Sequence, residues 1–492
     1  MSKPRLFTEI STKDLLTENG MATHSSSGSF VVDFYYKMGG FRKNASEPLG
    51  NLVSLFFSAY GENPNLALKA LLNLRDPRQG MGERNSARAI WHFFAKAHPE
   101  IVQKFIPYIA EYGRWDDLWA FIGTSCEKVA VEEILQGLRK GDALCAKWMP
   151  REKKSEHLFA LYFMKIFSLN PREYRKLLAG LTNVVETKMC QKRWGEINFQ
   201  HVPSQAMKIY RNAFRKHEPE RFGKFLEKVA SGEAKINTAT LSPVDIVHQY
   251  GCPYPTALDT ALEALWTNLR DVVPPEISFL PIADVSGSMN GTPMEVAISL
   301  GIYLAQRNKS VFKNGLITFS DKPVFHFMQG KTLHDRIVEV GRMDWGGSTN
   351  LQAVFELILN TALRAKLSPE ELPTHLMIIS DMQFNGAVNL GRGKNSWERS
   401  GYAAPVSVTD TALEMLDKMF TKAGYKRPNI FFWNVRTSEG VPAKMDENGV
   451  GLVSGYSPNL LRSVLSGDLN PINQVMVILN SPRYEIVDKL LG

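Results

Sequence analysis

The hydrophobic pattern of the chain changes near residue 272, and this change restricts the fold more than any other feature of the sequence. Across residues 51–272, apolar side chains recur at the three- and four-residue spacing of helices, with Pro or Gly between the runs. Across 273–492, short apolar runs alternate with helical stretches, the pattern of βαβ units. We therefore predict a multidomain α + α/β protein. Residues 1–50 are polar and Ser/Gly-rich at 23–29, and we expect an irregular lead-in there.

The two main parts are expected to differ in architecture. The 51–272 part should be an all-α, helical-repeat-like region, and the 273–492 part a doubly wound, mostly parallel, Rossmann-like domain covered by helices on both faces. Helices are expected near 293–307, 350–366 and 410–423. Strands are expected at 277–283, 315–319, 375–379, 429–435 and 474–479.

One motif carries specific chemistry. Asp284, Ser286 and Ser288 follow the 277–283 strand directly, where ligands bind in open α/β sheets. Their alternate spacing lets the three side-chain oxygens converge on one side of a loop. A carboxylate with hydroxyls and water suits Mg²⁺, which keeps several waters and needs few protein charges. The alternative is a metal-free loop in which Asp284 caps a helix.

Two further segments extend this motif. Residues 345–350 (WGGSTN) precede a helical stretch, and residues 375–381 form an apolar strand that ends in Ser-Asp. Together the three segments resemble the metal-ion-dependent adhesion site of von Willebrand A domains. The resemblance implies the first motif as direct metal ligands, with Thr349 and Asp381 completing the site directly or through water. Because Ser348 intervenes in the family's Gly-Gly-Thr pattern, either Ser348 or Thr349 is the hydroxyl.

The positive charge of the chain is concentrated in one segment. The net charge is +8, and residues 141–230 hold 18 basic and 9 acidic residues. Clusters of this kind suit phosphates, and neighbouring aromatic side chains can stack on bases. The alternative is a set of amphipathic helices with solvated basic faces. The candidate RNA-binding residues are Arg151, Lys153, Lys154, Arg172, Arg175, Lys176, Lys188, Lys192, Arg193, Lys208, Arg211, Arg215 and Lys216.

Several helical-part strings also carry a resemblance, among them 75–84 (RDPRQGMGER) and 113–118 (GRWDDL). With SDMQF at 380–384 they resemble, nearly end to end, a family catalogued only as a domain of unknown function with a von Willebrand A-like C-terminal half. More distantly, the domain order resembles the Ro autoantigen family. That resemblance implies a TROVE-like ring of helical repeats that binds structured, non-coding or misfolded RNA and is closed by the A domain.

The sequence contains no convincing catalytic set, because GxSxG, HExxH and P-loop patterns are missing. We expect a non-enzymatic, RNA-binding ribonucleoprotein component whose Mg²⁺ site binds an acidic ligand or protein partner. The alternative is a metal-dependent protein–protein adaptor without RNA. Four scattered cysteines, no secretory h-region and no membrane-length apolar run favour a cytoplasmic protein that does not bind membranes.

Overall fold

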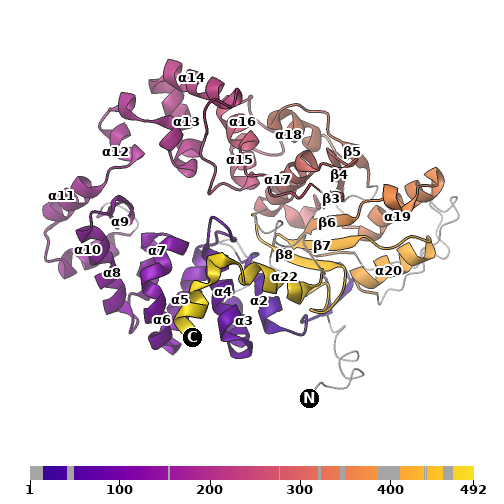
Figure 1. Cartoon of the computed structure of the whole chain (residues 1–492), viewed down its shortest axis with the longest axis horizontal. Helices are drawn as coiled ribbons and strands as arrows, with labels where there is room; N and C mark the ends of the chain where they lie inside the picture. Colours follow the sequence, from indigo (N-terminus) through magenta and orange to yellow (C-terminus); the bar gives the residue numbers. More distant parts are fainter. Residues whose placement is uncertain are drawn as a thin grey trace.

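The structure, a computed structural model, describes residues 15–41, 49–152, 156–275, 277–319, 323–343, 349–385, 410–436, 438, 440–457 and 469–492. Its N-terminal half is helical, and its C-terminal part is built on a mixed, mostly parallel sheet (Figure 1). The predicted α + α/β organisation is confirmed at this level.

Helices of the first part begin where the sequence places breakers. Asn63 and Asn170 each cap a helix whose first residue is Pro, and their side chains accept backbone N–H groups of the first turn. The helices are α3 (Leu49–Glu62), α4 (Pro64–Arg75), α5 (Asn85–Ala97), α6 (Pro99–Phe105), α7 (Ile109–Tyr112), α8 (Glu127–Arg139), α9 (Ala143–Trp148), α10 (His157–Ile166), α11 (Pro171–Leu181), α12 (Val185–Cys190), α13 (Ser204–His217), α14 (Pro219–Ala230), α15 (Pro243–Tyr250) and α16 (Thr260–Thr267).

The sheet of the second part has six described strands in the order β5-β4-β3-β6-β7-β8. Neighbours are parallel except β5, which is antiparallel to β4 at one edge. Nearly every residue of the inner strands is buried, so both faces are covered. The strands are β3 (Phe279–Ala283), β4 (Gly315–Thr318), β5 (Phe325–Phe327), β6 (His375–Ser380), β7 (Asn429–Asn434) and β8 (Val450–Ser454); the helices are α17 (Thr292–Arg307), α18 (Leu333–Gly341), α19 (Leu351–Ala365), α20 (Ala412–Lys422), α22 (Pro471–Leu479) and α23 (Ile486–Leu491).

The helices of the first part form an arc, and both ends of the arc meet the sheet-containing part (Figure 1). At the first end, α4 packs against α22 and α23. There the Arg483 guanidinium lies 2.9 Å from the fully buried Asp76 carboxylate, and Lys69 lies 2.9 Å from Asp488. The chain's last helices therefore fasten the beginning of the arc.

At the second end, α15 packs on α17, and α16 contacts α18. His248 Nδ1 lies 2.8 Å from a Glu295 carboxylate oxygen. The Trp266 indole N–H donates to the Gln306 side chain at 2.7 Å. Arc and sheet part thus form one closed ring of elements (Figure 1).

The predicted irregular lead-in is wrong for part of its length. A nine-residue helix, α2 (Phe30–Met38), lies within it and buries Phe34, Tyr35 and Tyr36 completely. The helix packs against β8, α3 and α22. The Ser29 side chain caps it by accepting the Val32 N–H, a signal that is present in the sequence.

The predicted strand at 474–479 is also wrong, because this segment belongs to helix α22. Short apolar runs cannot be assigned to helix or strand by periodicity alone, and Asn470-Pro471 supplies the helix cap and first residue. The sixth position of the sheet is taken by β8, which the sequence analysis missed. Gly451 lies inside that strand because a Cβ there would approach the Phe431 ring to 2.4 Å.

No helix within the described ranges is both long and apolar enough to span a membrane.

The closing contact at the first end gives a stability prediction. Arg483→Gln would leave the buried Asp76 carboxylate without its cation, so the free energy of unfolding should fall by about 2–4 kcal/mol. The matched control is Arg139→Gln, because the Arg139–Glu132 pair is exposed and should contribute less than about 1 kcal/mol. Chemical denaturation measures both, and equal losses in the two variants would contradict the assignment.

Candidate functional site

The predicted metal-binding residues lie where the order of the strands reverses. β3 and β6 are adjacent and parallel. From β3 the chain continues to the neighbouring strand β4, and from β6 it continues to β7 on the other side of the pair. Their register pairs Ala283 with Ile379, so Asp284 and Ser380 come next to each other at the carboxyl ends. Ligands of open α/β sheets bind at such a switch point.

Asp284 is completely buried and held by two hydrogen bonds. Its Oδ1 accepts the Ser286 backbone N–H at 2.9 Å, and its Oδ2 accepts the Ser380 hydroxyl at 2.5 Å. The Ser380 hydroxyl in turn accepts the Met382 N–H at 3.0 Å. Ser380, which was not predicted as a site residue, thus orients the Asp284 carboxylate.

Asp381, the second predicted carboxylate, is also buried at this edge. Its Oδ1 accepts the Gln383 N–H at 3.2 Å. Its Oδ2 is buried and has no hydrogen-bond partner among the described residues. A buried carboxylate oxygen without a donor is costly, so a ligand for this atom is expected.

Two of the predicted hydroxyls lie close together. Ser286 Oγ and Ser288 Oγ are 3.1 Å apart, with Ser286 buried and Ser288 half-buried. Thr349 is buried directly before α19, and its carbonyl accepts the N–H of Asn385, which follows β6. Ser348 lies outside the described residues, so the choice between Ser348 and Thr349 stays open.

The electrostatics of the site reflect two carboxylates in one buried place. Burial, and secondarily the nearby Asp381 carboxylate, raise the pKa of Asp284 to about 6. Burial likewise raises the pKa of Asp381, while Ser288 and Arg436 act against that shift. Among the described residues, no three His, Cys, Asp or Glu side chains come together as a metal-binding group. One of the two carboxylates can therefore hold a proton. Alternatively, the two carboxylates and the hydroxyls can bind a cation.

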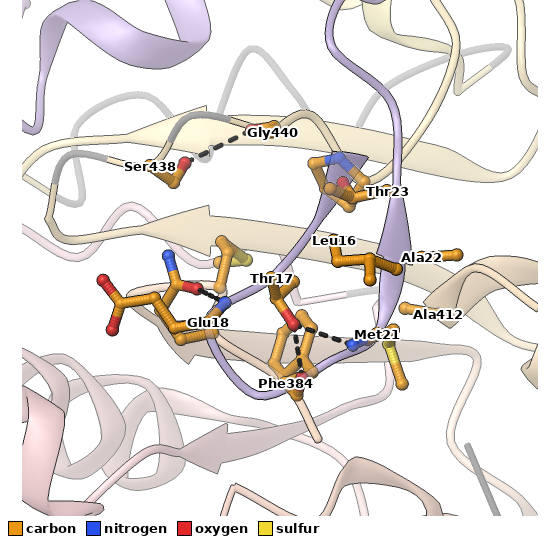
Figure 2. A pocket seen from close by; sticks show the side chains of 13 residues that line it. Leu16, Thr17, Glu18, Met21, Ala22, Thr23, Phe384, Ala412, Ser438 and Gly440 are labelled. Atoms are coloured by element: carbon orange, nitrogen blue, oxygen red, sulfur yellow. Dashed lines mark hydrogen bonds between the residues drawn. The ribbon is translucent and has the colours of Figure 1, made fainter. Parts of the chain in front are cut away.

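A segment near the N-terminus, which we call the strap (residues 15–24), crosses this edge of the sheet. It includes the short strands β1 (Leu15–Leu16) and β2 (Ala22–Thr23). The Thr17 hydroxyl donates to the Phe384 carbonyl at 2.6 Å, and the Glu18 N–H donates to the Gln383 side chain at 2.7 Å (Figure 2). A cavity of about 200 Å³ lies between the strap and the residues that follow Asp381. The strap was not predicted from the sequence.

Three of the predicted RNA-binding residues on α13 are engaged within the protein. Lys208 lies 2.7 Å from Asp245. Arg211, which is buried, and Arg215 each lie 2.7 Å from a different oxygen of Asp259. These three cations of the predicted RNA-binding face are therefore paired with acidic side chains of α15 and of the residue that caps α16.

Further predicted cations also have partners inside the chain. Arg175 pairs with Glu152 at 2.6 Å, and Arg193 with Glu196 at 3.3 Å. The Lys188 ammonium donates to the Glu196 carbonyl at 3.1 Å.

The remaining predicted cations divide into three groups. Arg151 is half-buried and donates to the Ala146 carbonyl at 3.1 Å. Lys153 and Lys154 lie outside the described residues. Four side chains are exposed and form no ion pair with any described residue: Arg172, Lys176, Lys192 and Lys216.

These features define a class of protein: a helical arc closed by a mostly parallel sheet that carries two buried aspartates at its switch point. A family model described as "Domain of unknown function (DUF2828)" matches residues 17–133 and 142–269. A second, described as "Domain of unknown function (DUF7788)", matches residues 278–478.

The uncharacterized protein L728 of Acanthamoeba polyphaga mimivirus is 30% identical to this chain over 522 aligned residues, covering 94% of this chain and 86% of that protein. The chain belongs to the same family as L728. The predicted membership of an uncharacterised family is thereby confirmed.

The aspartate pair gives a pH prediction. Asp284 binds its proton more tightly in the folded than in the unfolded chain, so the free energy of unfolding in a chelator should decrease as the pH rises from about 4 to about 6.5. The decrease attributable to this group is about 3 kcal/mol. Asp284→Asn should remove it, and subtracting the two pH profiles cancels the carboxyls that do not interact with Asp284. Parallel profiles for the two proteins would refute this.

Proposed function

We propose that this protein is a cation-dependent binding protein whose sheet-containing part is a von Willebrand A-like domain. The observation that carries the proposal is the buried Asp381 oxygen that has no hydrogen-bond partner among the described residues, beside the buried Asp284 carboxylate. The strand order, the antiparallel edge strand β5 and the site at the switch point support the same reading.

Mg²⁺ fits this set of side chains. Asp284, Ser286 and Ser288 would hold the ion, with Asp381 and Thr349 (or Ser348) contributing directly or through water. Carboxylates and hydroxyls are hard oxygen donors, and two negative charges balance a divalent cation. When bound, the ion supplies a positive centre that an acidic side chain of a ligand can reach. The chain's own groups hold and orient the ion, which favours a binding role over catalysis.

The second part of the proposal is that the helical arc binds RNA, which makes the chain a ribonucleoprotein component. The supporting observation is the set of four exposed cations on α11, α13 and the segment after α12, none of which pairs with a described residue. Such side chains are able to contact phosphates without breaking an internal ion pair. The closed ring is compatible with the distant likeness to the Ro family. The competing candidate is a metal-dependent protein–protein adaptor, in which the same cations contact an acidic protein surface.

The cation site makes a prediction about stability. Mg²⁺ should raise the free energy of unfolding of the wild-type protein by about 2.7 kcal/mol at a hundredfold excess over its dissociation constant. Asp284→Ala and Asp381→Asn should abolish the increase, whereas Asp446→Asn, at an exposed carboxylate, should keep it. Thermal unfolding in Mg²⁺ and in EDTA measures the effect. If the unfolding temperature of the wild-type protein changes with neither Mg²⁺ nor EDTA, the site is rejected. Comparing Ser348→Ala with Thr349→Ala identifies which hydroxyl contributes to the site.

The RNA proposal is tested by salt dependence. The variant with Arg172, Lys176, Lys192 and Lys216 all changed to Gln should bind structured RNA more weakly. The slope of log K against log salt should become shallower by about one for each phosphate that the variant no longer neutralises. A matched variant with Gln at Lys313, Lys366, Lys426 and Lys489, exposed cations of the sheet-containing part, should bind like the wild type. Absence of RNA binding at low salt would favour the adaptor.

A further inference from the structure

A second cavity lies where three distant parts of the chain meet. We call it the junction cavity; its volume is about 220 Å³. One wall comes from the loop between α4 and α5, a second from the loop between α14 and α15, and the third from the segment after α16 and from α17. The lining residues are Arg78, Gln79, Thr238, Ala239, Leu241, Pro243, Leu269, Arg270 and Tyr303.

Backbone hydrogen bonds hold the first wall in place. The loop after α4 folds back so that the Met81 N–H donates to the Asn73 carbonyl at 3.0 Å and the Arg78 N–H to the Asp76 side chain at 3.0 Å. A Cβ on Gly80 would lie 1.9 Å from the Asn73 carbonyl oxygen, so only glycine fits this turn. The loop therefore presents Arg78 and Gln79 in a defined position.

The other walls are fixed as well. The Tyr303 hydroxyl donates to the Arg270 carbonyl, and the Thr238 hydroxyl donates to the Asn268 carbonyl at 2.8 Å. Tyr303 is fully buried and Leu269 nearly so. The cavity is thus a product of ring closure and exists only when the two ends of the arc are in place.

The charges that line the junction cavity are all positive. Arg78 and Arg270 are its ionisable cations, and no acidic side chain is among the described lining residues. The exposed Arg270 guanidinium forms no ion pair with any described residue. Arg78 Nη1 donates to the Glu111 carbonyl at 2.8 Å, while the Glu111 carboxylate is engaged by Arg483 at 2.7 Å.

The surroundings add to this positive potential. Behind the cavity wall, the Arg307 guanidinium stacks 4.1 Å from the centre of the Tyr303 ring and donates to the Trp266 carbonyl. Arg307 forms no ion pair with a described carboxylate. Burial lowers its pKa, and the nearby Asp271 charge acts against this shift. The neighbouring acid, Asp271, lies 3.6 Å from Lys309. The local excess of guanidinium groups favours a doubly charged oxyanion.

We propose that the junction cavity is a binding site for a phosphate ester. Arg78 from the first wall and Arg270 from the third contact the phosphate oxygens, and the Gln79 amide donates to a further oxygen. Leu241, Pro243 and Leu269 form an apolar surface for the organic part of the ester. The ligand is a small phosphate monoester such as a nucleoside 5′-monophosphate, or the phosphorylated 5′ end of an RNA strand. The site uses none of the residues of the cation site and does not depend on it.

Calorimetric titration of the full chain with AMP, adenosine and inorganic phosphate tests the proposal. AMP should bind, adenosine should not, and phosphate should bind more weakly than AMP. Arg78→Gln and Arg270→Gln should each weaken AMP binding by about tenfold or more, the effect of losing a charged hydrogen bond. The matched control is Arg364→Gln, at an exposed arginine of α19, which should leave AMP binding unchanged.

A second arm identifies the source of the phosphate. A single-stranded RNA hexamer with a 5′-phosphate is compared with the same hexamer bearing a 5′-hydroxyl. Tighter binding of the phosphorylated hexamer, abolished in Arg270→Gln, assigns the site to an RNA end, whereas AMP binding alone assigns it to a free ester. The proposal is overturned if adenosine binds as well as AMP, if both cavity variants bind like the wild type, or if the control is weakened as much. Because the AMP arm needs no RNA, failure of the RNA proposal leaves it intact.

Discussion

Closure of the helical arc at both ends is the constraint on which the rest of the structure depends. The chain reaches the sheet through α15 and α16, and its last helices return to pack on α4, next to the beginning of the arc. The contact is charged: Asp76 is fully buried and meets Arg483 of the C-terminal segment. Breaking one member of such a pair costs more than forming the pair contributes, so the contact selects one way of closing the ring.

The same closure positions both candidate sites. Helix α2 bridges β8 and α3, which ties the sheet edge to the arc. The loop after α4 can line the junction cavity only because α4 is held against α22 and α23. At the switch point, two buried carboxylates lie near each other and accept few hydrogen bonds. When no ligand is bound, this arrangement lowers the free energy of unfolding. Local violations of this kind are expected where a protein binds something.

Much of this architecture could be predicted from local patterns. β3, β4, β6 and β7 follow from apolar runs, and the register of β3 with β6 brings Asp284 and Asp381 together as the motif order implies. β8 was missed because its glycine, required by the Phe431 ring, interrupts the apolar signal. α2 was missed because the Ser/Gly-rich stretch at 23–29 indicates irregular structure, and α22 because a short apolar run fits either helix or strand periodicity, although Ser29 and Asn470 mark the starts of the two helices.

The basic segment shows where sequence reasoning ends. Lys208 and Arg211 look like one solvated face of a helix, yet their acidic partners are Asp245 and Asp259, 37 and 48 residues further along the chain. Both partners lie outside residues 141–230. The net charge of that segment therefore overestimates how many of its cations are available to contact a ligand. Tertiary pairing of this range is invisible to local periodicity. Conversely, Arg270 belongs to no basic cluster in the sequence, and ring closure brings it to one cavity with Arg78 of the arginine-containing loop 75–84. The cations best placed to bind an anion are therefore those that the fold gathers at a cavity whose described lining contains no acidic side chain, wherever they lie in the chain.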